Sequence, residues 1–202
     1  MGSFLSRRVE AFVLLSFACV AGIVFLRQGP DRLIAVEVWA REIVHAADVA
    51  GKQDPALLAA LVYAESRGQV EAKSIAGARG LCQLLPSTAS EMALRHGISG
   101  SPWDPDNNLR LGAFYLREQL DRFQNDVDLA LLAYRLGPSA VSQAIQAAGS
   151  AEAYKEELRR RKPSPWEYRT QILRFRDRFA ERAQAGIGLG VVNLDKSRSL
   201  SS

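Results

Sequence analysis

Apolar residues recur at three- and four-residue spacing along most of this chain, which is the period of an amphipathic helix. The segment from Asp31 to about Ala50 shows the pattern first. Asp54-Pro55 then supplies a capping acid and a first-turn proline for a helix that ends at Glu65. The same spacing recurs in residues 109–123, 127–134, 141–148 and 166–182. Because no alternating run of useful length for a strand appears, we predict an all-α fold.

The stretch after Glu65 is rich in glycine rather than in periodic apolar residues, and Gly80 marks one of its expected turns. Thr88, with Glu91 three residues later, predicts a capping box that opens another helix. The Glu65 carboxylate is therefore expected beside a tight turn that carries the Gln83 amide.

Glu65 stands on the apolar stripe of its predicted helix, with Leu58, Leu61 and Val62 at helical spacing. Burial among leucines disfavours the charged carboxylate and raises its pKa toward the range in which an acid can protonate a leaving group near neutral pH. We therefore take Glu65 as a candidate general acid. One alternative stays open, in which the side chain bends out to solvent and pairs with Arg67.

Composition bounds the partners without deciding among them. The chain holds 26 Lys or Arg against 22 Asp or Glu, a net charge of +4, which suits a partner with an anionic surface. The excess gathers in residues 155–182, which we interpret as a solvated helix face. No zinc spacing, recognition-helix pattern or aromatic RNA-binding motif accompanies the charge, so we expect no nucleic-acid partner.

The histidines and cysteines predict neither a metal site nor a disulfide within the domain. His45 and His96 are isolated and lack a Cys, an Asp or a second His at ligand spacing. Cys19 lies in an apolar N-terminal run, and Cys82 lies in the glycine-rich stretch. The fold must then be held by its core, which a chain of 202 residues can bury.

Both ends of the chain differ from its helical middle. Sixteen almost wholly apolar positions, Ala11–Leu26, follow Arg7-Arg8, and we interpret residues 1–30 as a signal anchor or a signal peptide. The two arginines favour a cytoplasmic N-terminus, which predicts a periplasmic domain anchored to the inner membrane, or a secreted one if the leader is cleaved. Residues 184–202 mix glycine with serine and predict a flexible tail.

Several ordered motifs accompany Glu65. They are AGARGLCQLLPSTA at 76–89, DPDNNL at 104–109 followed by GAFYL at 112–116, and LALLAY at 129–134 leading to Gly137-Pro138. In order and spacing, residues 50–148 resemble the catalytic domain of the soluble lytic transglycosylases, which cleave peptidoglycan and belong to the goose-type lysozyme-like superfamily. A weaker likeness continues to about residue 175. The resemblance implies a lysozyme-like helical domain, which we place over residues 31–183.

The resemblance implies a reaction carried by one carboxylic acid, whereas most glycosidases use two. In this family the glutamic acid protonates the β-1,4 glycosidic oxygen between N-acetylmuramic acid and N-acetylglucosamine. As a carboxylate it then takes the proton of the sugar's own C6 hydroxyl, which attacks the anomeric carbon and leaves a 1,6-anhydromuramic end. Glu65 matches that acid, and Glu71, in a loop where exposure is expected, is a poor partner. No cofactor is required.

The resemblance also implies substrate-binding roles for five side chains. Ser74 would donate a hydrogen bond near the acid or the substrate, Gln83 would contact the glycan, and Leu85 would line the cleft. Tyr134 would present its hydroxyl to the cleft, and Tyr168 resembles the tyrosine of the family's closing helix. Structural alternatives stay open, with Ser74 as the cap of a turn, Gln83 as a partner of buried backbone and Tyr134 as a core tyrosine bonded to backbone.

The chain departs from the family pattern at several positions. Arg135-Leu136 replace an asparagine and a small residue, and Ser164-Pro165 replace a Glu-Thr pair. Cys82 stands where the family usually has methionine, and we interpret it as a small buried hydrophobe. Because arginine accepts no hydrogen bond and reaches further than asparagine, a substrate contact is lost or is replaced by one to a carboxylate of the peptide stem.

Two alternatives to a lytic transglycosylase stay open. One is a catalytically weakened module that binds peptidoglycan or acts as a scaffold in an envelope-spanning assembly, as the change at Arg135-Leu136 suggests. The other is a hydrolytic muramidase or chitinase of the same fold. The partners expected in the first reading are peptidoglycan strands, the inner membrane through the N-terminal segment and, as a further option, an envelope-spanning assembly.

Overall fold

The computed structural model describes residues 31–161 and 164–192, and these residues contain nine longer helices and a short helical stretch at 189–192, without a strand. The helices are α2 (Asp31–Glu37), α3 (Ala40–Val49), α4 (Pro55–Ser66), α5 (Pro86–His96), α6 (Pro105–Arg122), α7 (Val127–Leu136), α8 (Pro138–Ala148), α9 (Ala151–Arg161) and α10 (Ser164–Gln184). The all-α prediction is confirmed for this part of the chain. None of these helices is long and apolar enough to cross a membrane, and the predicted leader, residues 1–30, lies outside the described residues.

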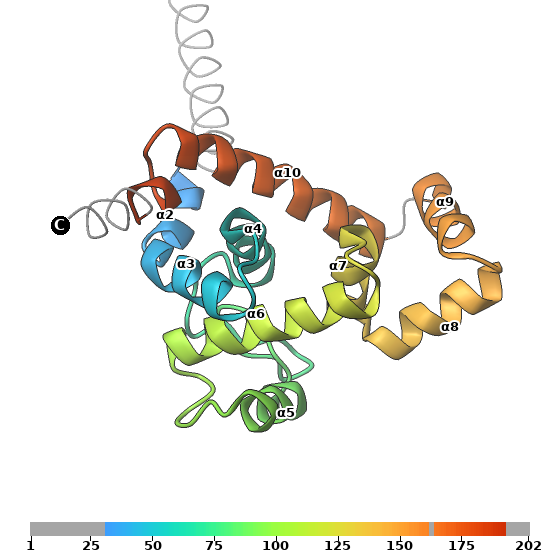
Figure 1. The fold of residues 1–202 in the computed structure, drawn as a ribbon, viewed down its shortest axis with the longest axis horizontal. Helices are drawn as coiled ribbons and strands as arrows, with labels where there is room; N and C mark the ends of the chain where they lie inside the picture. The colour runs from blue at the N-terminus through green and yellow to red at the C-terminus, as the bar shows by residue number, and fades with distance from the viewer. Residues whose placement is uncertain (1–30, 162–163, 193–202) are drawn as a thin grey trace, which may run out of the picture.

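Helix α4 forms the centre of the molecule, between α10 and α6 (Figure 1). It begins where predicted, because the Asp54 carboxylate accepts a hydrogen bond from the Ala56 amide at 2.9 Å and Pro55 occupies the first turn. The predicted single apolar stripe is too narrow a description. Residues 56–63 are all buried, since α2, α3 and α10 pack against different sides of the helix.

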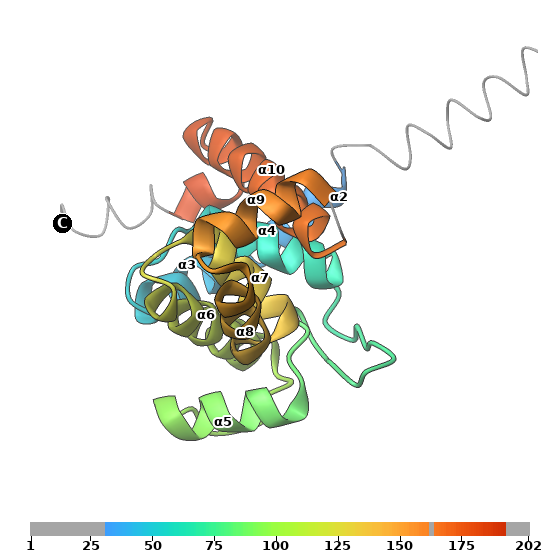
Figure 2. The same cartoon turned by 90° about the vertical axis from the view of Figure 1, so that its right-hand side faces the viewer.

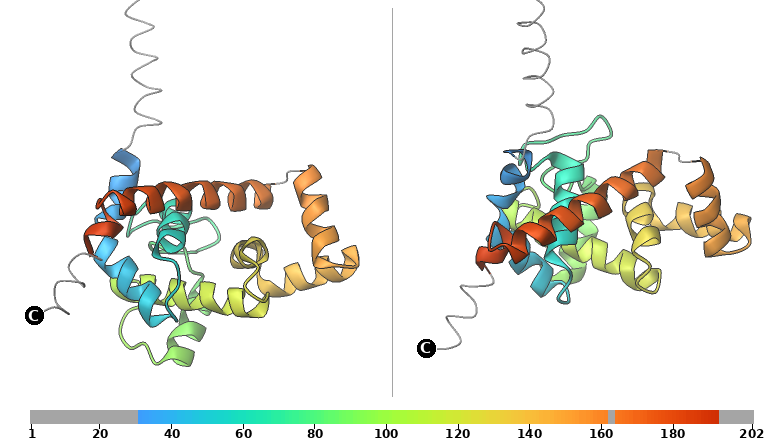
Figure 3. Two further views of the ribbon diagram at one scale, coloured as in Figure 1. Left: turned by 45° about the horizontal axis from the view of Figure 1, so that its top comes forward. Right: turned by 90° about the horizontal axis from the view of Figure 1, so that it is seen from above.

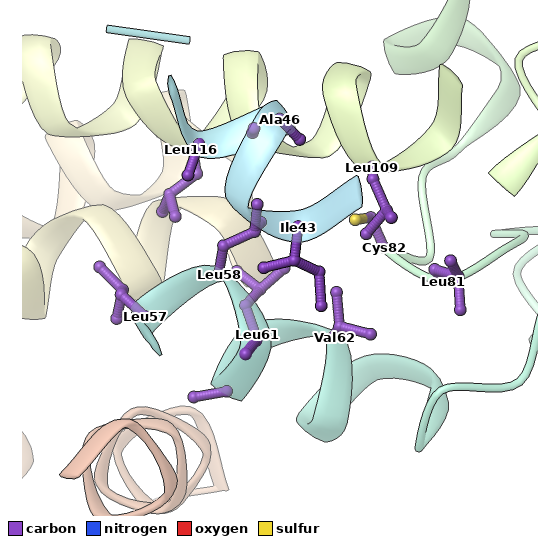
Figure 4. Close-up of a cluster of buried hydrophobic side chains, with 14 of the residues drawn as sticks. Ile43, Ala46, Leu57, Leu58, Leu61, Val62, Leu81, Cys82, Leu109 and Leu116 are labelled. Atoms are coloured by element: carbon purple, nitrogen blue, oxygen red, sulfur yellow. The ribbon is translucent and has the colours of Figure 1, made fainter. Parts of the chain in front are cut away.

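The main core joins α4 to α3 and α6 (Figure 4). Leu58 and Leu61 of α4 and Ile43 of α3 are wholly buried there, together with Leu109 and Leu116 of α6. Burying one such side chain stabilises the fold by about 1.5–3 kcal/mol. The core therefore holds α4 rigidly, and with it whatever stands at its C-terminal end.

The helix predicted from Asp31 to about Ala50 is two helices in the structure, α2 and α3. The chain turns at Val38 and Trp39, and the Trp39 indole donates a hydrogen bond to the Gly68 carbonyl oxygen at 3.3 Å. This contact ties the turn to the segment that follows α4. Apolar spacing alone could not show the break, because both helices keep their buried faces in phase.

The predicted capping box is wrong. Helix α5 begins at Pro86, and its N-cap is Leu85, which makes no side-chain capping bond. Proline at the first helical position already has a helical φ and lacks the amide that a cap would satisfy. Thr88 therefore lies inside the helix, and Glu91 instead pairs with Arg95 one turn later.

Helices α8 and α9 project from the rest of the molecule (Figures 1 and 3). A second apolar cluster, with Leu132, Tyr154 and Trp166 among its members, joins them to α7 and to the start of α10. The sequence did not predict α9 as a separate helix. Tyr154 is its sole buried residue, so its sequence reads as a charged segment rather than as an apolar stripe.

The flexible tail expected from residue 184 is not what the structure shows up to residue 192. Leu189 is 3% exposed and belongs to the main core. A Cβ on Gly188 would lie 2.6 Å from the Glu37 carboxylate, and that carboxylate binds Arg182 through two hydrogen bonds of 2.6 Å. The chain therefore stays packed against α2 after α10 ends. Residues 193–202 lie outside the described residues.

Candidate active site

Glu65 lies in the last turn of α4, where the chain leaves the core abruptly. Arg67 adopts a left-handed conformation with φ of 58°, and a Cβ on Gly68 would lie 2.3 Å from the Ala35 carbonyl oxygen. Only a glycine fits this close passage. The turn ends α4 directly after Glu65, so the carboxylate stands at the boundary between the core and a cavity.

The Glu65 carboxylate is held by Tyr168 of α10, whose hydroxyl donates a hydrogen bond to Glu65 Oε1. Burial raises the pKa of Glu65 above its ordinary value, while the Tyr168 hydrogen bond and the nearby Arg135 charge act in the opposite direction. Burial also raises the pKa of Tyr168 well above its usual range, which keeps the hydroxyl protonated as a donor. Arg67, the alternative partner that the sequence left open for Glu65, stacks on another residue: its guanidinium lies 4.4 Å from the centroid of the Tyr63 ring.

A cavity of about 570 Å³ opens in front of Glu65. It is lined by Glu65 together with Ser74, Gln83, Leu85, Thr88, Tyr115, Tyr134, Arg135 and Leu136, among others. Four of the five predicted substrate-binding residues therefore line one cavity with the predicted acid, and the fifth, Tyr168, touches the acid itself. The walls come from the loop between α4 and α5 and from α5, α6 and α7; Figure 2 shows this loop projecting from the body.

Ser74 and Gln83 line the cavity while they also fix their own loop. The Ser74 hydroxyl oxygen accepts a hydrogen bond from the Ala78 amide at 3.1 Å. Gln83 Nε2 donates to the Ala72 carbonyl oxygen at 2.9 Å and to the Gly80 carbonyl oxygen at 3.1 Å. The structure therefore shows both structural alternatives, because Ser74 caps a turn and Gln83 binds backbone carbonyl oxygens. The hydroxyl hydrogen of Ser74 and the amide oxygen of Gln83 remain as the groups that could bind a sugar.

The Tyr134 hydroxyl does not face the cavity as a donor. It donates a hydrogen bond to the Cys82 carbonyl oxygen at 2.9 Å, and the side chain is 8% exposed. Burial raises the pKa of Tyr134 well above its usual range. The alternative of a core tyrosine bonded to backbone describes this hydroxyl, although the residue still contributes to the cavity wall.

Asn108 lies behind the cavity wall and supports it, a role that the sequence did not reveal. It is completely buried in α6, its Oδ1 accepts from the Cys82 amide at 2.9 Å, and its Nδ2 donates to the Pro102 carbonyl oxygen at 3.0 Å. A Cβ on Gly80 would lie 2.6 Å from the Asn108 amide group. The sequence offered one signal of this role, since Asn108 lies in the DPDNNL motif at a position that helical spacing places on the buried face.

Cys82 is completely buried, and burial raises the pKa of its thiol far above the usual range. Its sulfur packs where a Cβ on Gly112 would lie, only 2.3 Å away. The interpretation of Cys82 as a small buried hydrophobe is confirmed. Glu71 is exposed, and among the described residues no group of three or more His, Cys, Asp or Glu side chains could hold a metal ion.

A model of the transglycosylase SLT domain family matches residues 42–157, more than half of the chain. The protein belongs to this family. Its relatives include the transglycosylase of Enterobacteria phage PRD1, which is 42% identical over 51% of this chain and 36% of its own length. Membrane-bound lytic murein transglycosylase F of Pseudoalteromonas translucida is 36% identical over 47% of this chain and 20% of its own length.

An inactive mutant of the lytic transglycosylase Slt from Pseudomonas aeruginosa has a similar structure, with a TM-score of 0.63 and 26% identity. The similarity covers 73% of this chain and 24% of that protein. The protein thus has the helical fold of a lytic transglycosylase domain, while it spans only a minor part of the length of these relatives. Helix α10, which supplies Tyr168, lies beyond the residues that the family model matches.

Proposed function

We propose that this protein is a peptidoglycan lytic transglycosylase that cleaves the β-1,4 bond between N-acetylmuramic acid and N-acetylglucosamine. The observation that carries this proposal is a partly buried carboxyl, Glu65, at the wall of a cavity and bonded to the hydroxyl of the buried Tyr168. Desolvation favours the protonated acid, as a proton donor to a glycosidic oxygen requires. Membership of the family supports the same reaction.

The proposed reaction needs one acid in two successive states. Glu65 gives its proton to the glycosidic oxygen, and the bond from that oxygen to the muramoyl C1 breaks. The resulting carboxylate takes the proton of the C6 hydroxyl of the same sugar, whose oxygen bonds to C1 and closes the anhydro ring. Glu65 ends as it began, protonated. The Tyr168 hydroxyl donates to the carboxylate in the middle of this cycle, when its charge is greatest.

The presence of a single carboxylate among the described residues that line the cavity supports this route over hydrolysis. Glycosidases that use two acids need a second carboxyl to act as nucleophile or to activate water. Among the described residues that line the cavity, Glu65 is the sole carboxylate, and Glu71 is exposed elsewhere on the loop. An attacking hydroxyl that already belongs to the substrate needs no second acid to position water.

A binding or scaffolding module is the second candidate function. The departure from the family pattern at Arg135-Leu136 suggests this function. It lies in the site itself, because both residues line the cavity. Such a module would bind glycan strands without cutting them. The intact pairing of Glu65 with Tyr168 favours the enzyme, since a binding module has no need of a desolvated acid held by a tyrosine hydroxyl.

We further propose a periplasmic location with an inner-membrane anchor, or a secreted form if the leader is cleaved. The support is the apolar run Ala11–Leu26 and the name of the relative from Pseudoalteromonas translucida, a membrane-bound lytic murein transglycosylase. A part in an envelope-spanning assembly stays a prediction from the sequence alone.

The release of soluble fragments from purified sacculi separates the two candidate functions. We expect the full chain to release fragments, Glu65→Gln to release about a hundredfold less or none, and Glu71→Gln to match the parent. Glu71 is a matched control because it is an exposed acid on the neighbouring loop. Equal binding of sacculi by all three proteins without release by any would favour the scaffold, and full activity of Glu65→Gln would exclude Glu65 as the acid.

A further inference from the structure

Arg135 contributes the single positive charge among the described residues that line the cavity, and Glu65 contributes the single negative one. Arg135 lies in the last turn of α7 and is exposed. Its guanidinium stands 4.6 Å from the centroid of the Tyr168 ring, and Tyr168 in turn binds Glu65. A cation is thus positioned one aromatic ring away from the candidate acid.

Other arginines on the neighbouring helix are engaged differently. Arg169, Arg176 and Arg182 of α10 form ion pairs with carboxylates of α7, the α4 cap and α2. Within the part of the chain that the structure describes, no carboxylate lies within ion-pair distance of Arg135. Its guanidinium therefore keeps its edge available for an external acceptor while one face rests on the Tyr168 ring.

The glycan backbone of peptidoglycan is neutral, and its carboxylates are carried by the substituent on C3 of the muramoyl ring. They belong to the peptide stem or, where the stem has been removed, to the lactyl group. The muramoyl ring also holds the C1 atom at which the glycosidic bond breaks. A substrate placed for reaction at Glu65 therefore brings a carboxylate-bearing arm into the same cavity as Arg135.

Resting on the proposed function, we propose that Arg135 binds a carboxylate on the muramoyl substituent and so selects acidic glycan strands over neutral ones. A guanidinium suits this task because its planar edge can donate two parallel hydrogen bonds to a carboxylate. Because Arg135 already stacks on the Tyr168 ring, its side chain loses less conformational entropy when it binds a ligand. Arg135 is thus a specificity residue, and Glu65 remains the acid.

The test measures binding by isothermal titration in full-length protein that carries Glu65→Gln, so that no strand is cut and no carboxylate remains at position 65. The probes are glycan strands with intact peptide stems, the same strands with every carboxylate amidated, and strands stripped of their stems so that the lactyl carboxylate is exposed. Adding Arg135→Gln should weaken binding of the acidic stem-bearing strands about five- to tenfold and leave binding of the amidated strands unchanged.

Arg178→Gln is the matched control, because Arg178 stacks on Phe175 at 5.5 Å and does not line the cavity. It should bind all strands as its background does. A five- to tenfold loss that persists on stripped strands identifies the lactyl carboxylate, and a loss confined to stem-bearing strands identifies the stem, and both results support the proposal. An equal loss on acidic and amidated strands, or no loss on either, overturns it.

This design tests the carboxylate site independently of the proposed lytic activity, because binding is measured without cleavage. If the parent protein releases nothing from sacculi but the charge-dependent binding is present, the carboxylate site stands and the lytic activity fails. If the parent cleaves sacculi but Arg135→Gln binds acidic strands normally, the lytic activity stands and the carboxylate site fails. A protein that binds none of the strands contradicts both.

Discussion

The pKa of the Glu65 carboxyl depends on three influences from three helices, of which one raises it and two lower it. Its place on α4 removes water and raises its pKa, while the hydrogen bond from Tyr168 on α10 and the charge of Arg135 on α7 lower it. An acid that must first donate and then accept a proton works best when its pKa lies near the working pH. Each of the two side chains that lower the pKa can be changed without touching Glu65 itself.

Tyr168→Phe should move the pH profile and slow the reaction together. The change keeps the ring under Arg135 but removes the hydrogen bond that lowers the pKa of Glu65. The reaction needs the protonated acid, so the alkaline limb of kcat/KM should move to higher pH. Loss of the donor to the carboxylate should also lower kcat about tenfold. A pH series on soluble muropeptides measures both, and an unmoved alkaline limb would show that the hydrogen bond does not tune the acid.

Glu65→Gln should stabilise the fold increasingly as pH rises. Because the folded-state pKa of Glu65 is raised, its contribution to stability is fully present below the unfolded-state pKa and is lost as pH rises through the folded-state value. Glutamine has no such loss. The difference in Tm between variant and parent should therefore be larger at about pH 8 than at about pH 4. A constant difference in thermal melts across this range would contradict a buried, titrating carboxyl.

At the scale of elements, the turn of residues 80–83 is held from outside by two helices. Asn108 of α6 binds the Cys82 amide, and Tyr134 of α7 binds the Cys82 carbonyl oxygen. Sequence motifs located this turn, and the capping acid Asp54 with Pro55 located the start of α4, because both signals are local. The use of Asn108 and Tyr134 as supports could not be predicted, since it depends on contacts across 26 and 52 residues.

Asn108→Ala should destabilise the protein by about 1–3 kcal/mol. It leaves the Cys82 amide without its acceptor inside the core and the partly buried Pro102 carbonyl without its donor. Asn107→Ala is the control, because that amide binds the Ser99 and Ser101 carbonyls at the protein surface. The control should lose less than about 1 kcal/mol. Urea unfolding compares the two, and equal losses would contradict the structural role of Asn108.

At the scale of the whole molecule, α10 completes a site that lies far away in sequence. Tyr168 and Glu65 are separated by 103 residues, and α10 packs along α4 beyond the end of the family match. The likeness of this helix to the family's closing helix pointed to Tyr168, although its contact with Glu65 appears only in the structure. The packed segment at Leu189 escaped prediction because a glycine-rich sequence carries no local sign of a distant partner.

Phe179→Ala should loosen α10 from α4 and destabilise the fold by about 3–5 kcal/mol, because the Phe179 ring is 1% exposed and its loss leaves a cavity. Cleavage of sacculi should fall with it, since Tyr168 belongs to the same helix. Ile187→Ala is the control, as its side chain is 43% exposed, and it should cost less than about 1 kcal/mol. Urea unfolding measures both. Similar, small losses would mean that α10 contributes little to the fold.

The chemical identity of the new glycan ends tests the central claim most directly, namely that Glu65 acts alone as acid and then base. Sacculi are digested by the full chain in heavy-oxygen water, and the released fragments are analysed by mass spectrometry. The account predicts 1,6-anhydromuramic ends, which are lighter than reducing ends by one water and carry no heavy oxygen. Glu65→Gln should release none of these products. Reducing ends labelled with heavy oxygen would mean that water attacks C1, which contradicts the single-acid mechanism.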